Sequence, residues 1–478
     1  MNPADPAELL AARMLMAFTL GTHIILVPLG VAFPFLVLIA NFIGLKRKDP
    51  VALKLAQRWS HVMAVLFAVG AVSGTVLSFE MGLLWPGLTG IFGDVFGLPI
   101  SLEGIFFFLE AIFISIYIFG WKRLSPWPHF WSGVVLPVVA LGGVFSIISA
   151  NGWMNMPTGF TLGSDGRPTD VDPIAAIFNP ALGYEFWHML AAAYMTAGFL
   201  VAGVFAMAKL HGHWDRYQRL AFAIPFTVAA IVAPLQMMIG DTVARTVFQE
   251  MPVKFAAIEI VWNTGPDQPE IILGELNQTT GVVNGGFPIP GLASWLSGFS
   301  TSTVITGLSG VPRDNQPPAT IVHWAWDGMI FGGTGLALLA TWYLLYWIIR
   351  RRLPGTAWFY RCAAVAGVLS VFCIECGWTV TEVGRQPWIV YNILRTADAV
   401  TTAGMVRPLF AVVLVIYGLI IVATVLTLRS MSRRWNAGEV VEPNIPYGPI
   451  IASSNGTTTP PATSPLASVG ASEGEERP

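Results

Sequence analysis

A histidine and a methionine lie at similar depths in two of the chain's apolar segments. His188 follows Tyr184, where one segment begins, by four residues, and Met329 follows His323, near the start of another, by six. At about 1.5 Å per helical residue, these positions are about 6 and 9 Å from the segment ends. The two side chains could therefore meet across one flat cofactor, since His and Met form an axial pair for an electron-transferring haem. Each could equally pack against or bond to a neighbouring helix.

Carboxylates are the second group of reactive residues in the apolar segments. Glu103 and Glu110 are seven residues apart and so fall on one helix face, and Glu375 and Glu382 have the same spacing. Ionisable groups at membrane depth are costly and mark functional sites by default. His23 lies in the same half of the membrane, so His23, Glu103, Glu110 and Glu382 could form one cluster that binds a metal centre or relays protons.

Residues 375–388 concentrate polar side chains at the end of an apolar run. Glu382, Arg385, Trp378 and Trp388 all lie there, at the point where the run should meet water. Tryptophan and arginine often serve as anchors at the lipid headgroups, with no chemistry to perform. That interpretation stays open for Trp388, whereas two carboxylates on one helix face favour a functional site.

The composition defines the kind of protein that carries these groups. Of its 478 residues, 54% are hydrophobic and 11% are charged, which is far more apolar than a soluble domain. The chain is therefore a membrane protein with several spans. The net charge of −2 says nothing about nucleic acid, but no basic cluster is interleaved with aromatic residues, as strand binding would need, so no nucleic-acid partner is expected. Cys373 and Cys376 have CxxC spacing, which on a membrane helix favours small packing residues over a redox pair.

Nine apolar segments are long enough to cross a bilayer, which takes about 20 residues each. We expect an all-α integral membrane bundle with spans near 14–40, 57–80, 99–120, 130–150, 184–208, 220–243, 322–349, 361–382 and 406–428. Lysines and arginines gather in the connections after every odd span. Because basic loops stay in the cytoplasm, the N-terminus is predicted to lie outside and the C-terminus inside.

The connections complete the predicted organisation. Residues 1–243 hold spans one to six, residues 244–321 form a long outer loop, and residues 322–435 hold spans seven to nine. A loop of that length is usually functional or disordered, and we expect an ordered amphipathic segment in its first part, through Trp262. Residues 436–478 are rich in Ser, Thr, Pro and Gly and are predicted to form a disordered cytoplasmic tail.

Several motifs, taken together, resemble subunit I of cytochrome bd quinol oxidase over nearly the whole chain up to the tail. The most specific is GRQPW at 384–388, preceded by Glu382; the others are SLEG at 101–104 with FLE at 108–110, GTH at 21–23 before VPL at 27–29, and KFAAIE at 254–259. The resemblance implies a terminal oxidase of the bacterial cell membrane. Such an enzyme oxidises ubiquinol or menaquinol at the outer face and reduces O2 to water with protons from the cytoplasm, so that a proton motive force forms without pumping.

The resemblance also implies roles for single residues. His188 and Met329 would hold a low-spin haem b that takes electrons from quinol. His23 and Glu382 would be axial ligands of two further haems, a high-spin haem b and a haem d, or a haem b in place of haem d. The remaining implied residues are Trp378 and Arg385 beside the haems, Glu103 as a ligand or proton acceptor, Glu110 on the proton route, and Lys254 and Glu259 at the quinol site.

The implied partners are a second large subunit of similar fold, subunit II, and one or more single-span peptides. Two features depart from the family pattern. The outer loop has the short form, and Asp327 stands two residues before Met329 in place of an arginine, which would lower the potential of the low-spin haem. Two other functions remain open from the residues alone: an ion-coupled secondary transporter, in which buried Glu and His couple ions, and a b-type cytochrome that relays electrons to a partner.

Overall fold

The computed structural model describes residues 6–436 and Tyr447. In this part of the chain, nine helices are long and apolar enough to cross a membrane, which confirms the predicted nine-helix membrane architecture. They are α1 (Pro6–Arg47), α2 (Pro50–Leu84), α3 (Pro86–Gly120), α4 (Pro126–Asn155), α6 (Leu182–Leu210), α7 (Arg216–Glu250), α10 (Ala319–Arg350), α11 (Ala357–Val383) and α13 (Val406–Asn436). The predicted disordered tail lies outside the described residues, apart from its first residue and Tyr447.

Most of these helices extend beyond the apolar segments that predicted them, because polar residues outside the hydrocarbon layer continue the helix and cap it. α2 begins at Pro50, not near residue 57, and the Asp49 carboxylate accepts hydrogen bonds from the amides of Val51 and Ala52. α7 begins with a capping box in which Asp215 and Gln218 satisfy each other's backbone amides. Such caps stabilise the first turn of a helix, and a count of apolar residues does not register them.

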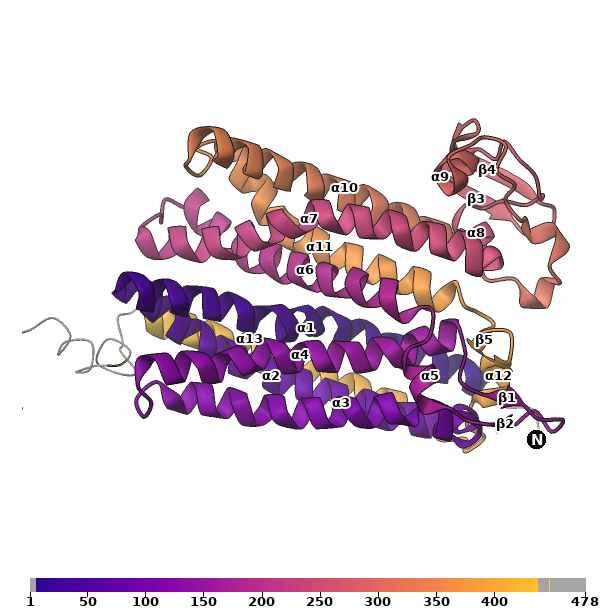
Figure 1. Cartoon of the computed structure of the whole chain (residues 1–478), viewed down its shortest axis with the longest axis horizontal. Helices are drawn as coiled ribbons and strands as arrows, with labels where there is room; N and C mark the ends of the chain where they lie inside the picture. Colours follow the sequence, from indigo (N-terminus) through magenta and orange to yellow (C-terminus); the bar gives the residue numbers. More distant parts are fainter. Residues whose placement is uncertain (1–5, 437–446, 448–478) are drawn as a thin grey trace, which may run out of the picture.

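The helices form two groups that lie side by side along the length of the molecule (Figure 1). α6, α7, α10 and α11 enclose an aromatic core in which Phe222, Phe226 and Phe359 are fully buried and in ring contact. α1, α2, α3, α4 and α13 form the other group. α1 contacts α6 and α11 as well as its own group, so it joins the two.

Short elements cover one end of the bundle, where the outer loop was predicted (Figure 1). They are β1 (Thr161–Leu162), β2 (Pro168–Thr169), α5 (Pro173–Ile177), α8 (Pro252–Ile258), β3 (Glu270–Asn277), β4 (Val282–Ile289), α9 (Leu292–Gly298), η1 (Leu308–Gly310), η2 (Arg313–Asn315), β5 (Trp388–Val390), β6 (Leu394–Arg395) and α12 (Thr396–Ala399). α8 lies where an ordered segment was expected. The later part of the loop, which the sequence left unassigned, contains the β3–β4 hairpin.

The hairpin pairing is interrupted at one position, where the backbone turns toward the membrane helices. β3 and β4 pair in one register from Glu270 with Ile289 to Asn277 with Val282, but the opposed residues Leu273 and Gly286 are left unpaired. Its φ of 56° is in the left-handed region, which costs a branched residue free energy. In this conformation the Leu273 amide donates a hydrogen bond to the Asp327 carboxylate of α10 at 2.7 Å.

Candidate functional site

His188 of α6 faces Gly240 of α7. A Cβ atom placed on Gly240 would make an ordinary contact of 3.6 Å with the imidazole Cε1 atom. The Gln236 side-chain nitrogen is 3.3 Å from both imidazole nitrogens, while its buried oxygen has no hydrogen-bond partner in the described part of the chain. Because amide oxygen and nitrogen can be exchanged by a flip, Gln236 can accept from one ring N–H and leave the other nitrogen free for a metal.

Met329 lies on α10 against α11. A Cβ atom on Gly377 would approach the Met329 Sδ atom to 3.2 Å, so only glycine lets α11 pass this close to the thioether. The sequence left open whether the neighbouring glycines clear space for a cofactor or for helix packing. Gly328 and Gly332 serve packing, because Cβ atoms there would lie 3.0 and 2.4 Å from the Sγ atoms of Cys376 and Cys373.

The other glycines near Met329 behave differently. A Cβ atom on Gly333, one turn beyond Met329, would meet no described atom within 4 Å, so the face that carries the thioether also has free space. Gly335 is exposed, and its Cβ would make an ordinary contact of 3.9 Å with Leu369. The glycines of α10 therefore divide between packing and open space.

His23 is held by α2. Its Nδ1 atom is 2.8 Å from the Ser73 hydroxyl, and a Cβ atom on Gly74 would lie 3.2 Å from its ring. One turn before His23, the Thr19 hydroxyl donates to Glu80 at 2.6 Å. Glu80 is 3% exposed, and its second oxygen has no partner among the described residues. The sequence analysis did not single out Glu80, although an acid at the end of an apolar run is the same signal that identified Glu382.

The acids predicted to cluster with His23 lie in separate surroundings. Glu382 accepts hydrogen bonds from Asn151 at 2.7 Å and from Arg385 at 2.5 Å. Glu103 and Glu110 are half-buried on α3. Within the described residues, no three His, Cys, Asp or Glu side chains are placed to bind one metal ion. A haem needs no such cluster, because the porphyrin supplies four ligands and the protein one or two.

Glu375 faces α1 from the same helix as Glu382. A Cβ atom on Gly21, two residues before His23, would approach its Oε2 atom to 3.4 Å. Its Oε1 atom is buried and has no hydrogen-bond partner among residues 6–436 and Tyr447. A buried carboxylate with an unused oxygen needs an explanation, and this one points to an unfilled polar contact beside the His23 segment.

A buried ionic network connects α8 with the end of α11. Lys254 is 4% exposed, and its Nζ donates to the Thr381 carbonyl at 3.2 Å. Burial lowers the pKa of Lys254 to about 8. Glu185 of α6 is close enough to interact electrostatically with Lys254 and Arg385, and it accepts from Asn155 at 3.1 Å. Glu185 was not predicted, although it is ionisable and lies one turn before His188.

Arg385 has unused hydrogen-bonding capacity in this network. It is 3% exposed, and its Nε and Nη1 groups have no acceptor among the described residues. Buried guanidinium donors are rarely left unpaired, and they match the two oxygens of a carboxylate. The site therefore fits a carboxylate-bearing cofactor, and haem propionates are carboxylates.

A second buried acidic cluster lies under the hairpin. Glu259 is 5% exposed, and its carboxyl group is in hydrogen-bond contact with that of Glu270. Burial, with repulsion from Glu270 and Asp327, raises the pKa of Glu259 well above its usual value, and burial also raises the pKa of Glu270. The His323 Nδ1 atom is 2.7 Å from the Ile258 carbonyl, to which it donates, and its Nε2 atom is 3.5 Å from Asp327.

Lys254 and Glu259 were expected at one quinol site, but the structure places them in different clusters. Five residues correspond to about 140° around a helix, so Lys254 faces α11 while Glu259, just past the end of α8, faces β3 and α10. Side-chain direction at the end of a short helix depends on tertiary packing. Their presence in one sequence motif, KFAAIE, could not show that Lys254 and Glu259 face different clusters.

An apolar groove opens beside the acidic cluster. It has a volume of about 470 Å³ and is lined by Ile272, Leu273, Gly286 and Phe287 of the hairpin and by Phe331 of α10. Phe331 lies one turn beyond Asp327. The groove is within the size range of small-ligand sites, and it places an apolar surface next to proton-accepting groups.

The fold and these sites together define a class: a multi-span helical membrane protein with histidine, methionine and arginine side chains that suit haem binding and an apolar groove. Residues 11–435 match the family described as "Cytochrome bd terminal oxidase subunit I". The chain therefore belongs to the cytochrome bd oxidase subunit I family. Membership confirms the predicted quinol oxidase activity, the use of haem and quinol, the bacterial multi-pass membrane location and a subunit II partner. It also sets aside the transporter and the relay cytochrome.

Individual relatives cover most of the chain. It is 33% identical over 437 residues to "Putative cytochrome bd menaquinol oxidase subunit I" of Bacillus subtilis, spanning 89% of this chain and 97% of the relative. It is 26% identical over 496 residues to "Cytochrome bd-II ubiquinol oxidase subunit 1" of Escherichia coli, spanning 88% and 96%. "The structure of bd oxidase from Geobacillus thermodenitrificans" matches with a TM-score of 0.84 and 33% identity, covering 91% of this chain and all of that one.

Proposed function

We propose that His188 and Met329 are the axial ligands of a low-spin haem b. A glycine faces each side chain, Gly240 beside His188 and Gly377 beside Met329, and Gln236 can orient the imidazole. When bound, the haems supply the electron path from quinol and the iron at which O2 is reduced. The protein's contribution here is to fix the two ligands on α6 and α10, whose shared core is rigid and aromatic.

The same proposal assigns the other haem ligands. His23 and Glu382 would hold the high-spin haem b and haem d, or a haem b in place of haem d. Arg385 would bind a propionate through its unpaired donors, Trp378 would lie beside the haems, and Glu103 would be a further ligand or proton acceptor. The hydrogen bonds from Asn151 and Arg385 fix the orientation of the Glu382 carboxylate, as second-shell groups do at metal sites.

Quinol oxidation takes place, in this proposal, where the acidic cluster meets the apolar groove. Glu259 accepts a proton from the quinol hydroxyl, and the ring and tail lie against Phe287 and Phe331. A raised pKa suits a general base, because the group then accepts and releases protons near working pH. Lys254 lies on the opposite side of α8, where its charge supports the Glu382 and Arg385 network.

Proton movement then generates the gradient. Protons leave quinol at the outer end of the bundle, and Glu110 with Glu103 passes cytoplasmic protons along α3 toward the oxygen site. Charge separation arises because the two reactions use protons from opposite sides, so no pump is needed. Besides subunit II, one or more single-span subunits complete the assembly.

The observation that supports the haem assignment best is the pair of unpaired buried donors on Arg385 next to Glu382. The test is a pyridine haemochrome analysis of the purified complex, with and without the R385Q substitution. We expect intact wild-type haem content and a selective loss of high-spin haem in R385Q, measured by the carbon monoxide difference spectrum. Unchanged high-spin haem in a folded R385Q complex would contradict the assignment.

A further inference from the structure

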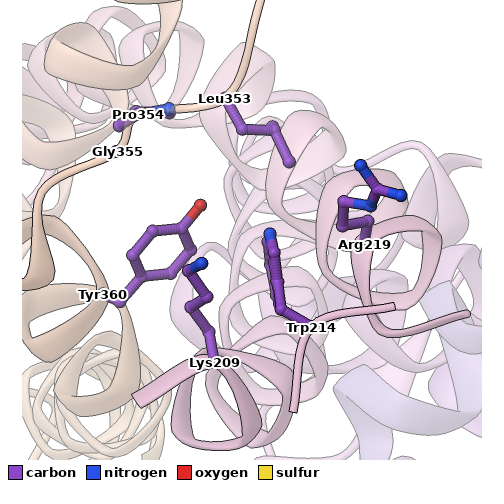
Figure 2. Close-up of a pocket in the computed structure, with 7 residues that line it drawn as sticks. All are labelled: Lys209, Trp214, Arg219, Leu353, Pro354, Gly355 and Tyr360. Atoms are coloured by element: carbon purple, nitrogen blue, oxygen red, sulfur yellow. The ribbon is translucent and has the colours of Figure 1, made fainter. Parts of the chain in front are cut away.

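A pocket at the opposite end of the bundle from the hairpin has no role in quinol oxidation. It has a volume of about 410 Å³ and lies between the α6–α7 and α10–α11 connections. Figure 2 shows Lys209, Trp214 and Tyr360 side by side around one opening, with the Tyr360 hydroxyl pointing into it. The pocket combines cationic, aromatic and hydroxyl groups, which is the chemistry of an anion site.

Both cations of the pocket lack a carboxylate partner within the described chain. The Lys209 Nζ atom lies 5.1 Å from the centre of the Trp214 ring. The Arg219 side chain donates through Nε to the backbone oxygen of Asp215 at 3.3 Å. The Asp215 carboxylate is used elsewhere, since it caps α7 by accepting from the Gln218 amide at 3.1 Å. Two positive charges therefore remain available to one ligand.

Uncharged donors complete the site. Tyr360 is 1% exposed, and in the described residues its hydroxyl makes no hydrogen bond, although it points into the opening. The pocket also borders the start of α11, where the Thr356 hydroxyl caps the Trp358 amide at 3.3 Å. A helix N-terminus favours negative charge, and Gly355 beside it leaves open space for a ligand.

We propose that this pocket binds the phosphate group of an anionic phospholipid from the cytoplasmic leaflet. The loops at this end carry the excess of lysine and arginine, which predicts that it faces the cytoplasm. The adjacent turns expose apolar side chains, Met207 at 46% and Trp358 at 66%, so the pocket lies at the boundary between lipid and water. Basic pockets between helix ends at this depth suit phospholipid headgroups.

Binding would connect two helical hairpins. Lys209 and Arg219 belong to the α6–α7 pair, while Gly355 and Tyr360 belong to the α10–α11 pair. A phosphate that contacts both pairs restrains their separation at this end. His188 and Met329 lie on the same two pairs nearer the other end, so the lipid acts as a distant structural clamp on the same four helices.

The test uses the purified complex with its partner subunit, stripped of lipid and transferred to phosphatidylcholine nanodiscs. Phosphatidylglycerol is titrated and retained lipid is counted by native mass spectrometry, with dioleoyl phosphatidylethanolamine, which is zwitterionic and has no net charge, as the comparison. We expect K209Q/R219Q to bind phosphatidylglycerol about 25-fold more weakly, because each cation near an anionic lipid contributes about 1 kcal/mol, or about fivefold. R47Q/K54Q, which removes the same charges from the α1–α2 connection, should bind as the wild type does.

A second variant separates the pocket from general surface charge. G355L keeps every charge but fills the open space beside Gly355, and it should also abolish the high-affinity lipid. Normal binding by G355L would show diffuse attraction and overturn the proposal, as would equal losses in R47Q/K54Q and K209Q/R219Q. A separate titration with inorganic phosphate tests whether the pocket prefers the lipid to the free anion. If phosphate alone saturates the pocket and the lipid binds no more tightly, the lipid assignment is overturned. Haem content verifies that each variant is folded.

Discussion

Substitution of Gly332 by alanine should loosen the contact between α10 and α11 and disturb Met329, the proposed haem ligand three residues away. The added Cβ would lie 2.4 Å from the Cys373 Sγ atom and 3.2 Å from Leu369 Cδ1. Real Cβ atoms do not approach a neighbour to 2.4 Å, so the two helices must separate or the thiol must rotate within a buried seam. Either movement changes where α10 holds the thioether.

The expected magnitude follows from two opposing effects. Inserting a methyl group into a packed core typically costs about 1–3 kcal/mol, while replacing glycine by alanine inside a helix returns about 1 kcal/mol. The net destabilisation of G332A is therefore about 0–2 kcal/mol. G335A is the matched control on the same helix, because its Cβ would make only a 3.9 Å contact, and it should be neutral or slightly stabilising.

The assay follows the low-spin haem signal in reduced-minus-oxidised spectra while the purified complex is heated at a fixed rate, since unfolding of such complexes is irreversible. G332A should lose the signal at a lower temperature than the wild type and G335A. The double variant G332A/C373A removes the clashing sulfur, so the two substitutions should couple favourably by about 1–2 kcal/mol. A G332A complex as stable as G335A, or the absence of any coupling, would refute the packing argument.

Three further predictions concern the proposed site. M329L should selectively remove the low-spin signal from reduced-minus-oxidised spectra, and an intact signal would refute the His188–Met329 pairing. E110Q should retain full haem content but slow oxygen reduction, so unchanged turnover at full haem content counts against a proton role. E270Q removes the carboxyl group beside Glu259 and should therefore lower the raised pKa of Glu259. Because Glu259 is then deprotonated at lower pH, the acid limb of the pH profile of kcat/KM for quinol should move to lower pH. His323 and Asp327, the other titratable groups there, remain unchanged, and a limb that stays in place would exclude Glu259 as the base.

Sequence patterns predicted the membrane architecture well because bilayer thickness imposes a length of apolar chain that is visible without any alignment. All nine spans correspond to helices. The outer loop was harder, because the pairing of its hairpin is interrupted at Leu273. Leu273 has no turn propensity, and its left-handed conformation is stabilised by the hydrogen bond to Asp327. Local propensity cannot anticipate a strained residue that a distant carboxylate supports.

For the site, the sequence identified candidate ligands but not the groups that orient them. Gln236 and Glu185 were missed because neither belongs to a motif, and their importance appears only when α7 and α8 are placed beside α6. Asp327 was expected to influence the haem through Met329. In the structure its Oδ2 atom instead accepts from the hairpin and faces His323, so its charge also belongs to the acidic cluster.

The separation of Lys254 from Glu259 suggests how one short helix could divide the products of quinol oxidation. On the proposed assignment, Glu259 takes the proton on the hairpin side of α8, next to Glu270 of β3. Lys254 faces the other side, toward Glu382 and Arg385, where the cofactors would lie. A positive charge there favours the arrival of electrons and repels protons. Protons and electrons are thus directed apart at the first step, which is the condition for building a gradient without a pump.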